Sequence, residues 1–208
     1  MEKLTKKQED ALREMANIGS GNASTALSKI IGMKVKITVP SANIIPVDEL
    51  GSLIIGPKAE VVGIYAPVTG GVIGNILMIY PVKDSLMLMD FIEKKQPGTS
   101  KELTAVHKKK ILEIGEATST SYLEAINGLL SLNAKKGNSK IIVTEGASIA
   151  NFIKIGVGGK DYALVLRAET GFDLPDLNIK GEFILVLSIK EINKLSELLS
   201  KKEAGETK

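Results

Sequence analysis

Residues 4–31 read LTKKQEDALREMANIGSGNASTALSKII, and this stretch decides the fold. Its apolar residues recur mostly on one side of a 3.6-residue period, which predicts a long helix with one face against a core. Another side carries Asp10, Glu14, Asn17 and Gly21, spaced four, three and four residues apart. Residues three and four apart are neighbours on a helix surface, so the sequence predicts one short polar stripe there.

The polar stripe has two interpretations. Exposed helix faces are usually polar, so these four residues can simply be solvated. Alternatively, Glu14 and Asn17 reach into a partner's cleft, and Gly21 lets the helix backbone come close to that partner. Gly19 and Gly21 each cost about 1 kcal/mol relative to alanine inside a helix, so both call for a packing or contact reason.

Composition excludes several classes of protein. The chain has 208 residues, 44% of them hydrophobic, which is enough for a substantial core. It has no cysteine and a single histidine, His107, so we predict no disulfide, no thiol catalysis and no metal site. The net charge of +3 is spread along the chain and only two of the 27 basic residues are arginine, so we expect no nucleic-acid partner.

Two further patterns bear on location and ligands. No apolar run approaches the roughly 20 residues that a membrane helix needs. The first ten residues, MEKLTKKQED, lack the apolar segment of a signal peptide, so we expect a cytoplasmic protein with no membrane insertion. The turns VTGGVIG and VGGK lack the spacing of phosphate-binding loops, which disfavours a small-molecule-binding protein.

The rest of the chain alternates between strand and helix patterns. Gly32 ends the first helix, and alternation over residues 35–39 predicts a half-buried strand whose ladder pairing Pro40 stops. Strands are predicted at 59–66 and 74–80, joined by a turn at the double glycine. The remaining predictions are a helix at 83–95, a linker at 96–100, a helix at 101–132, strands at 140–144, 161–168 and 182–189, and a helix at 190–202.

The order helix, strand, hairpin, helix occurs twice, and residues 74–84 align with residues 181–191 without a gap. We infer an internal duplication, with repeats at 4–98 and 101–202 inside a single domain, 1–208. Residues 203–208 are expected to fray. The predicted fold class is α/β (α+β), in which two pseudo-twofold-related halves form a β-sheet covered by two long adjacent helices.

Alignment of the two long helices compares the polar stripe with its counterpart in the second half. The core-facing apolar positions agree between the halves, whereas the polar positions differ. The matched pairs are Asp10 with Lys109, Glu14 with Glu113, Asn17 with Glu116, Gly21 with Thr120, and Pro40 with Ser139. Either only the first half carries a site, or the stripe is unconstrained surface.

The spacing Asp10-x3-Glu14-x2-Asn17-x22-Pro40 resembles the signature of the CheC/CheX/FliY family of chemotaxis phosphatases. The surrounding residues, EMANIGSGNASTALSKIIGMKVKITVP, and the duplicated organisation are most similar to CheC. The resemblance implies a hydrolase of signal transduction, which removes the aspartyl phosphate from the response regulator CheY. It further implies that Glu14 pairs with a lysine of the regulator and that Asn17 orients the attacking water.

The resemblance implies no cofactor of the chain's own, since Mg²⁺ is expected to come with the phosphorylated regulator. Asp10, Gly21 and Pro40 are expected to support the site rather than to perform chemistry. In the second half, Glu116 would put a carboxylate where the water-orienting amide belongs, and its charge would face the phosphoryl group. We therefore predict that the second site, with Glu113 and Glu116, is degenerate.

Family members also bind CheD, a receptor deamidase, through an apolar helix in the second half. The candidate segment here is residues 145–155, in which Ile149, Phe152 and Ile153 would form the contact. Apolar residues at helical spacing are also what a core helix needs, so burial of these three is the competing prediction. The alternative function for the whole chain is a non-catalytic chemotaxis adaptor that binds CheD or a motor component.

Overall fold

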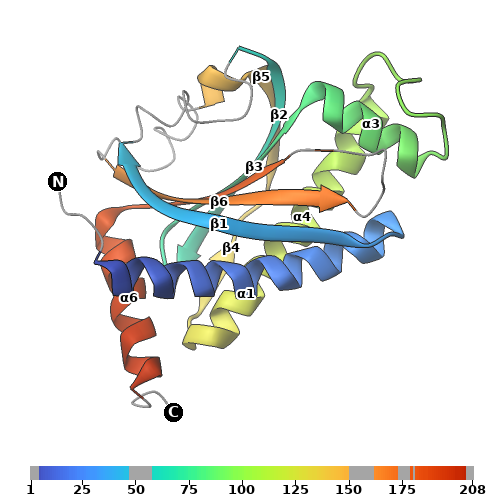
Figure 1. The fold of residues 1–208 in the computed structure, drawn as a ribbon. Coiled ribbons are helices and arrows are strands. Elements are labelled where there is room, and N and C mark those ends of the chain that lie inside the picture. The colour runs from blue at the N-terminus through green and yellow to red at the C-terminus, as the bar shows by residue number, and fades with distance from the viewer. Residues whose placement is uncertain (1–4, 47–57, 150–161, 173–178, 180, 205–208) are drawn as a thin grey trace.

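The computed structural model describes residues 5–46, 58–149, 162–172, 179 and 181–204 (Figure 1). Its helices are α1 (Lys6–Ile31), α3 (Val82–Ile92), α4 (Ala105–Leu130) and α6 (Ile189–Glu203). Its strands are β1 (Val35–Pro46), β2 (Glu60–Gly70), β3 (Gly74–Pro81), β4 (Ala134–Lys136), β5 (Lys140–Glu145), β6 (Tyr162–Phe172) and β7 (Glu182–Leu187). Among the described residues, the strands form one seven-stranded antiparallel sheet in the order β1-β6-β7-β3-β2-β4, with β5 also paired to β2. The predicted class, a mixed α/β fold with a helix-covered sheet, is confirmed.

The ends of the two long helices follow from their sequence. The Thr5 side chain accepts from the Gln8 N–H and the Gln8 side chain binds back to Thr5, which makes a capping box at the start of α1. Gly32 ends α1 in the left-handed conformation, at φ 76°, as predicted. Thr104 caps α4 in the same way, with His107 in the third position. The second long helix is therefore shorter than the predicted 101–132.

The main core lies between the sheet and the helices. Leu12, Met15 and Leu27 of α1 are fully buried there. Tyr122 of α4 stacks at a tilt on Phe183 of β7, with ring centroids 4.4 Å apart. Burial of each such side chain stabilises the fold by roughly 1.5–3 kcal/mol, so the buried face of α1 holds this helix in place. Figure 1 shows α4 crossing behind α1, which agrees with the prediction of two adjacent long helices.

The centre of the sheet is the antiparallel pair β3–β7, in which Leu77 faces Ile184. These two residues are also partners in the gapless alignment of 74–84 with 181–191. The other strands follow outward in matched order, β2 and β5 on one side and β6 and β1 on the other. This is the arrangement expected of two pseudo-twofold-related halves, and the duplication itself stays a prediction.

The prediction that Pro40 stops the ladder pairing of its strand is wrong. Strand β1 continues to Pro46, and its register against β6 shifts between Thr38 and Ser41, around Pro40. Strand β1 is at the edge of the described sheet, where a bulge can absorb a residue without an N–H. Proline therefore interrupts the pairing locally, and the strand resumes beyond it.

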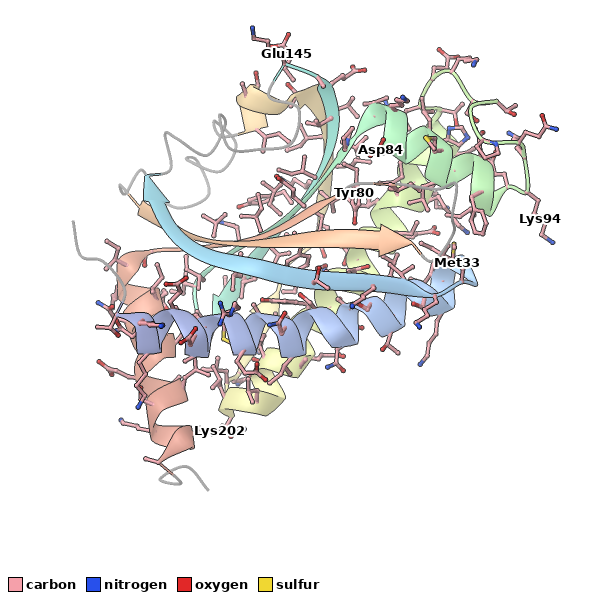
Figure 2. The ribbon with its side chains drawn as sticks, viewed as in Figure 1. Met33, Tyr80, Asp84, Lys94, Glu145 and Lys202 are labelled. Atoms are coloured by element: carbon pink, nitrogen blue, oxygen red, sulfur yellow. The ribbon has the colours of Figure 1, made fainter. Side chains whose placement is uncertain are left out.

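Smaller differences concern the connections and the C-terminal end. Strand β4 was not predicted, and α3 ends at Ile92 rather than at residue 95. Helix α6 reaches Glu203, so the predicted frayed tail begins inside it, and residues 205–208 lie outside the described part. In Figure 2 Lys202 marks this end of α6, and Met33 marks the turn from α1 into β1. None of the helices in the described part is both long and apolar enough to span a membrane.

Candidate functional site

The polar stripe of α1 lies on the exposed side of the helix. Asp10, Glu14, Asn17 and Gly21 are all exposed, whereas Met15 and its neighbours on the opposite side are buried in the core. Glu14 and Asn17 are one turn apart, so both side chains leave the helix on the same face. The structure thus presents a carboxylate and an amide together to solvent, on a helix whose other face is fixed.

Asp10 supports the start of this stripe. Its carboxylate accepts a hydrogen bond from the Arg13 guanidinium at 2.7 Å, and both side chains are about half exposed. A pair of this kind contributes at most about 1 kcal/mol. Asp10 is therefore engaged within its own helix, with Arg13 as a partner that sequence reasoning missed, and its supporting role in a site stays a prediction.

The two glycines of α1 have different surroundings. A β-carbon at Gly19 would lie 2.5 Å from the Tyr122 ring, so this glycine permits the close approach of α4. Around Gly21 the described structure places nothing within 4 Å of such a carbon. Packing therefore explains why residue 19 is glycine, whereas no packing contact in the described part of the chain explains why residue 21 is.

Serine side chains of α1 hold strand β1 along the helix. The Val35 N–H donates to Ser28 Oγ at 2.9 Å, and the Ile37 N–H donates to Ser24 Oγ at 2.8 Å. These bonds satisfy backbone donors on the outer edge of β1, and the strand runs back along α1 in Figure 1. Sequence reasoning missed both serines, although their four-residue spacing next to an edge strand was the available signal.

The second half repeats this helix-to-strand clamp at the matched positions. The Ala134 N–H donates to Asn127 Oδ1 at 3.0 Å, and Asn127 Nδ2 donates to the Ala134 carbonyl at 2.8 Å. Asn127 and Ala134 occupy the positions that match Ser28 and Val35 in the alignment of the halves. The same alignment matches Glu116 with Asn17 and Ser139 with Pro40, so the structure gives geometric support to those two pairings as well.

Glu116 is bound to its own half rather than presented to a partner. Its carboxylate pairs with Lys136 Nζ and accepts the Ser139 N–H at 2.8 Å. Partial burial acts to raise the pKa of Glu116, but the hydrogen bonds from Lys136 and Ser139 outweigh it and hold the pKa below its ordinary value. Of the other matched positions, Lys109 and Glu113 are exposed and Thr120 is half-buried.

The Glu116 pairing predicts a pH-dependent contribution to stability. A carboxylate whose pKa is lowered in the folded state stabilises the fold above its unfolded pKa, near 4.3, and loses that contribution as pH falls through the folded value. We expect Glu116→Gln to lower the free energy of unfolding at pH 7 by less than about 1 kcal/mol, because the pair is partly solvated. In urea titrations at pH 7 and pH 3, this difference should shrink at pH 3. The control is Glu113→Gln, which changes an exposed residue of the same helix and should leave the free energy of unfolding unchanged at both pH values. If Glu116→Gln were as stable as wild type at pH 7, the pair would not stabilise the fold.

The structure describes only one of the three residues predicted to contact CheD. Ile149 is 1% exposed and packs against Gly63, where a β-carbon would lie 3.1 Å from its Cδ1. It therefore belongs to the core in the described structure and is not part of a surface ridge. Phe152 and Ile153 lie outside the described residues. CheD binding stays a prediction, now without Ile149.

No metal centre is formed within the described part of the chain, where no three histidine, aspartate or glutamate side chains are grouped to hold an ion. The exposed face of α1 carries a carboxylate, Glu14, and a neutral amide, Asn17. A carboxylate can pair with a cation of a partner, and an amide can both donate to and accept from a water molecule. This combination suits recognition and the positioning of a water molecule on another protein.

Comparison with known proteins shows what the first helix and strand are similar to. Residues 8–44 match the model of the CheC-like family. The CheY-P phosphatase CheC of Bacillus subtilis (strain 168) is 26% identical over 136 residues, which are 62% of this chain and 63% of that protein. The flagellar motor switch phosphatase FliY of the same organism is 30% identical over 111 residues, which are 53% of this chain and 29% of that protein. The matched part is thus less than two thirds of either relative.

Solved structures share the fold. Thermotoga maritima FliY superposes with a TM-score of 0.80 at 22% identity, covering 96% of this chain and 98% of that one. The CheX–CheY–BeF3–Mg complex of Borrelia burgdorferi contains a chain that superposes with a TM-score of 0.53 at 12% identity, covering 81% of this chain and 96% of that one. At these identities the likeness concerns the fold alone. In sequence, this chain is similar to CheC and FliY, and its first helix and strand match the CheC-like family model.

Proposed function

We propose that this chain hydrolyses the aspartyl phosphate of a phosphorylated CheY-like response regulator. The observation that carries the proposal is the joint exposure of Glu14 and Asn17 on α1, inside the segment that matches the CheC-like family. The relatives named CheY-P phosphatase and motor switch phosphatase support the class of reaction. The CheX–CheY complex supports a regulator as the partner of this fold.

In the proposed mechanism, α1 docks over the phosphorylated aspartate of the regulator. Glu14 pairs with a lysine of the regulator and sets the position of the helix. Asn17 reaches the phosphoryl group and holds a water molecule in line for attack. Mg²⁺ held by the regulator supplies charge neutralisation at the phosphoryl oxygens.

A neutral amide is suited to this task for a physical reason. An acyl phosphate is already reactive, so the chain has to supply the position of the water rather than a nucleophile of its own. An amide orients water without bringing a negative charge to the phosphoryl oxygens, whereas a carboxylate would repel them. This difference supports placing the reaction in the first half, because Glu116 occupies the matched position in the second half and is already bound to Lys136.

The direct test follows the decay of a phosphorylated regulator. A CheY-like regulator from the same genome is phosphorylated with a small-molecule donor, the donor is removed, and phosphate loss is measured with and without the protein. We expect the decay rate to rise in proportion to the amount of protein added. If no regulator of that genome is dephosphorylated faster, the proposal fails.

Glu14 should act mainly on binding. We expect Glu14→Gln to raise KM for the phosphorylated regulator roughly tenfold, the equivalent of about 1.4 kcal/mol, because one partner of a charge pair is lost. The value of kcat should change little, since the pair with lysine forms before the chemical step. Steady-state kinetics with Glu113→Gln as the matched control measure both constants; a fall in kcat at constant KM would instead make Glu14 part of the chemistry.

The alternative is a non-catalytic adaptor that binds a motor component or CheD. The observation that favours it is the similarity to a motor switch protein, together with the loss of the amide from the second half. The same assay separates the two functions. An adaptor would bind its partner in a pull-down and leave the decay of the phosphorylated regulator unchanged.

A further inference from the structure

The polar stripe of α1 is too small to hold a regulator by itself. A standard protein–protein interface takes about 800 Å² and 20–30 residues from each partner, whereas the stripe has four residues. We propose that the groove between α1 and α4 is a second contact surface for the regulator, in which Lys29 binds an acidic side chain of the regulator and Glu124 binds a basic one. This inference rests on the proposed function and extends it from the reaction to the choice of partner.

The groove lies beside the place where α1 and α4 come closest. At Gly19 the two helices meet through the Tyr122 ring, and Figure 1 shows α4 crossing behind α1. Next to this crossing, small side chains leave an open groove of about 570 Å³ between the helices. Its apolar lining consists of Ala26 and Ile30 of α1 and Ala117 and Ala125 of α4. An apolar side chain of another protein can therefore be buried there.

The two walls of the groove carry opposite charges. Lys29 lines it from α1 and Glu124 lines it from α4, and both side chains are exposed. Within the described part of the chain, neither residue forms an ion pair or a hydrogen bond through its side chain, with the other or with a neighbour. A protein segment with a carboxylate on one flank and a cation on the other is complementary to both walls. Such complementarity selects a partner more than it adds raw affinity.

The place of the groove identifies its occupant as the regulator. Thr25 lines the groove, and its hydroxyl donates at 3.0 Å to the carbonyl of Gly21, the last residue of the polar stripe. The two surfaces are thus continuous along α1. Lys29 follows Asn17 by twelve residues, about 18 Å along a helix, whereas a small domain is roughly 30 Å across. A regulator seated over Glu14 and Asn17 therefore extends over the groove.

The charged positions of the groove, unlike an apolar one, differ between the two halves. The matched pairs are Ala26 with Ala125, Lys29 with Gly128, and Thr25 with Glu124. Equal walls would let a regulator dock in two orientations, one over the first half and one over the second. Opposite charges favour one orientation, because the other brings like charges together. The favoured orientation is the one over the first half, which carries the proposed reaction.

The first test reverses each charge and measures KM for the phosphorylated regulator. We expect Lys29→Glu and Glu124→Lys each to raise KM roughly tenfold with kcat unchanged, because contacts away from the reacting group act on binding. The double variant Lys29→Glu/Glu124→Lys should raise KM about 100-fold, since a regulator of fixed charges meets two repulsions and separate effects add.

The controls for the charge reversals are Lys58→Glu and Glu60→Lys, which change the net charge by the same amounts at exposed positions. Glu60 pairs in register with Glu145, which Figure 2 shows at the top of the molecule, away from α1. Both controls should keep the wild-type KM. A wild-type KM in either Lys29→Glu or Glu124→Lys overturns the inference. So does a double variant with restored KM, because the two charges would then pair with each other, within one chain or between two copies of it.

The second test locates the regulator directly. The chain has no cysteine, so Ser121→Cys introduces a single thiol in the groove, and Glu145→Cys places one far from it. We expect a beryllofluoride-loaded regulator to slow the reaction of the first thiol with a maleimide severalfold and to leave the second unchanged. An unslowed reaction in a Ser121→Cys protein that still dephosphorylates the regulator contradicts the proposal. Protection that grows with the concentration of the protein alone also contradicts it, since a second copy would then fill the groove.

The thiol measurement requires binding but no hydrolysis, so it separates this inference from the proposed function. If no regulator is dephosphorylated but one protects the thiol of Ser121→Cys, the proposed function fails and the groove remains a regulator surface. If a regulator is dephosphorylated without such protection, the groove has no part in docking and the proposed function stands. If no regulator is dephosphorylated and none protects the thiol, both fail.

Discussion

Asn17→Ala is expected to lower the acceleration of regulator dephosphorylation about 100-fold or more, the size of effect typical for removal of one group that orients or stabilises a reacting centre. The fold should be unaffected because the Asn17 side chain is exposed, and exposed substitutions usually change the free energy of unfolding by less than about 0.5 kcal/mol. A large loss of activity at unchanged stability would place this side chain in the chemistry.

The measurement is single-turnover decay of phosphorylated regulator with excess protein, beside urea unfolding of each variant. Asn22→Ala is the matched control, since Asn22 is another exposed asparagine of α1, whose amide donates to the Ile18 carbonyl at 3.1 Å. It should keep wild-type activity. Asn17→Asp should be as inactive as Asn17→Ala, because a carboxylate faces the phosphoryl oxygens with like charge. Full activity of Asn17→Ala would contradict the proposal that Asn17 orients the attacking water.

Local sequence signals predicted the helices and most strands well. The apolar period over residues 4–31 gave α1, and Gly32 marked its end because a left-handed cap needs a residue without a β-carbon. The order of strands in the sheet had no such signal, since β1 pairs with β6 from the far end of the sequence. Pro40 was misjudged for the same reason, because whether a proline ends a strand depends on which edge faces a neighbour.

The site was predictable to the extent that exposure follows from helical periodicity. The stripe of Asp10, Glu14, Asn17 and Gly21 is exposed as expected. The degenerate second site remains a prediction, but its physical basis changes. The sequence suggested repulsion between Glu116 and a phosphoryl group, whereas the structure shows the carboxylate bound to Lys136 and Ser139, which lie on a later segment and could not be paired with it from spacing.

Gly19→Ala is expected to destabilise the protein by about 2 kcal/mol, which lowers the melting temperature by roughly 4–8 °C for a chain of this size. The new methyl group would lie 2.5–3.0 Å from three atoms of the Tyr122 ring. The ring is fully buried and stacks on Phe183, so it cannot move aside without disturbing the core. This cost exceeds the gain of about 1 kcal/mol that alanine brings to a helix.

Gly21→Ala, two residues further along α1, should have the opposite sign. Nothing in the described structure lies within 4 Å of its added carbon, so the helix gains about 0.5–1 kcal/mol of stability. In the regulator assay the same variant should raise KM, because the methyl group separates two backbones that would otherwise approach closely. A calorimetric scan measures the stability of both glycine variants, and the decay assay measures their KM for the phosphorylated regulator. If Gly21→Ala is more stable and equally active, this glycine takes no part in docking. Neither packing nor contact with a partner would then explain why glycine is present at this position.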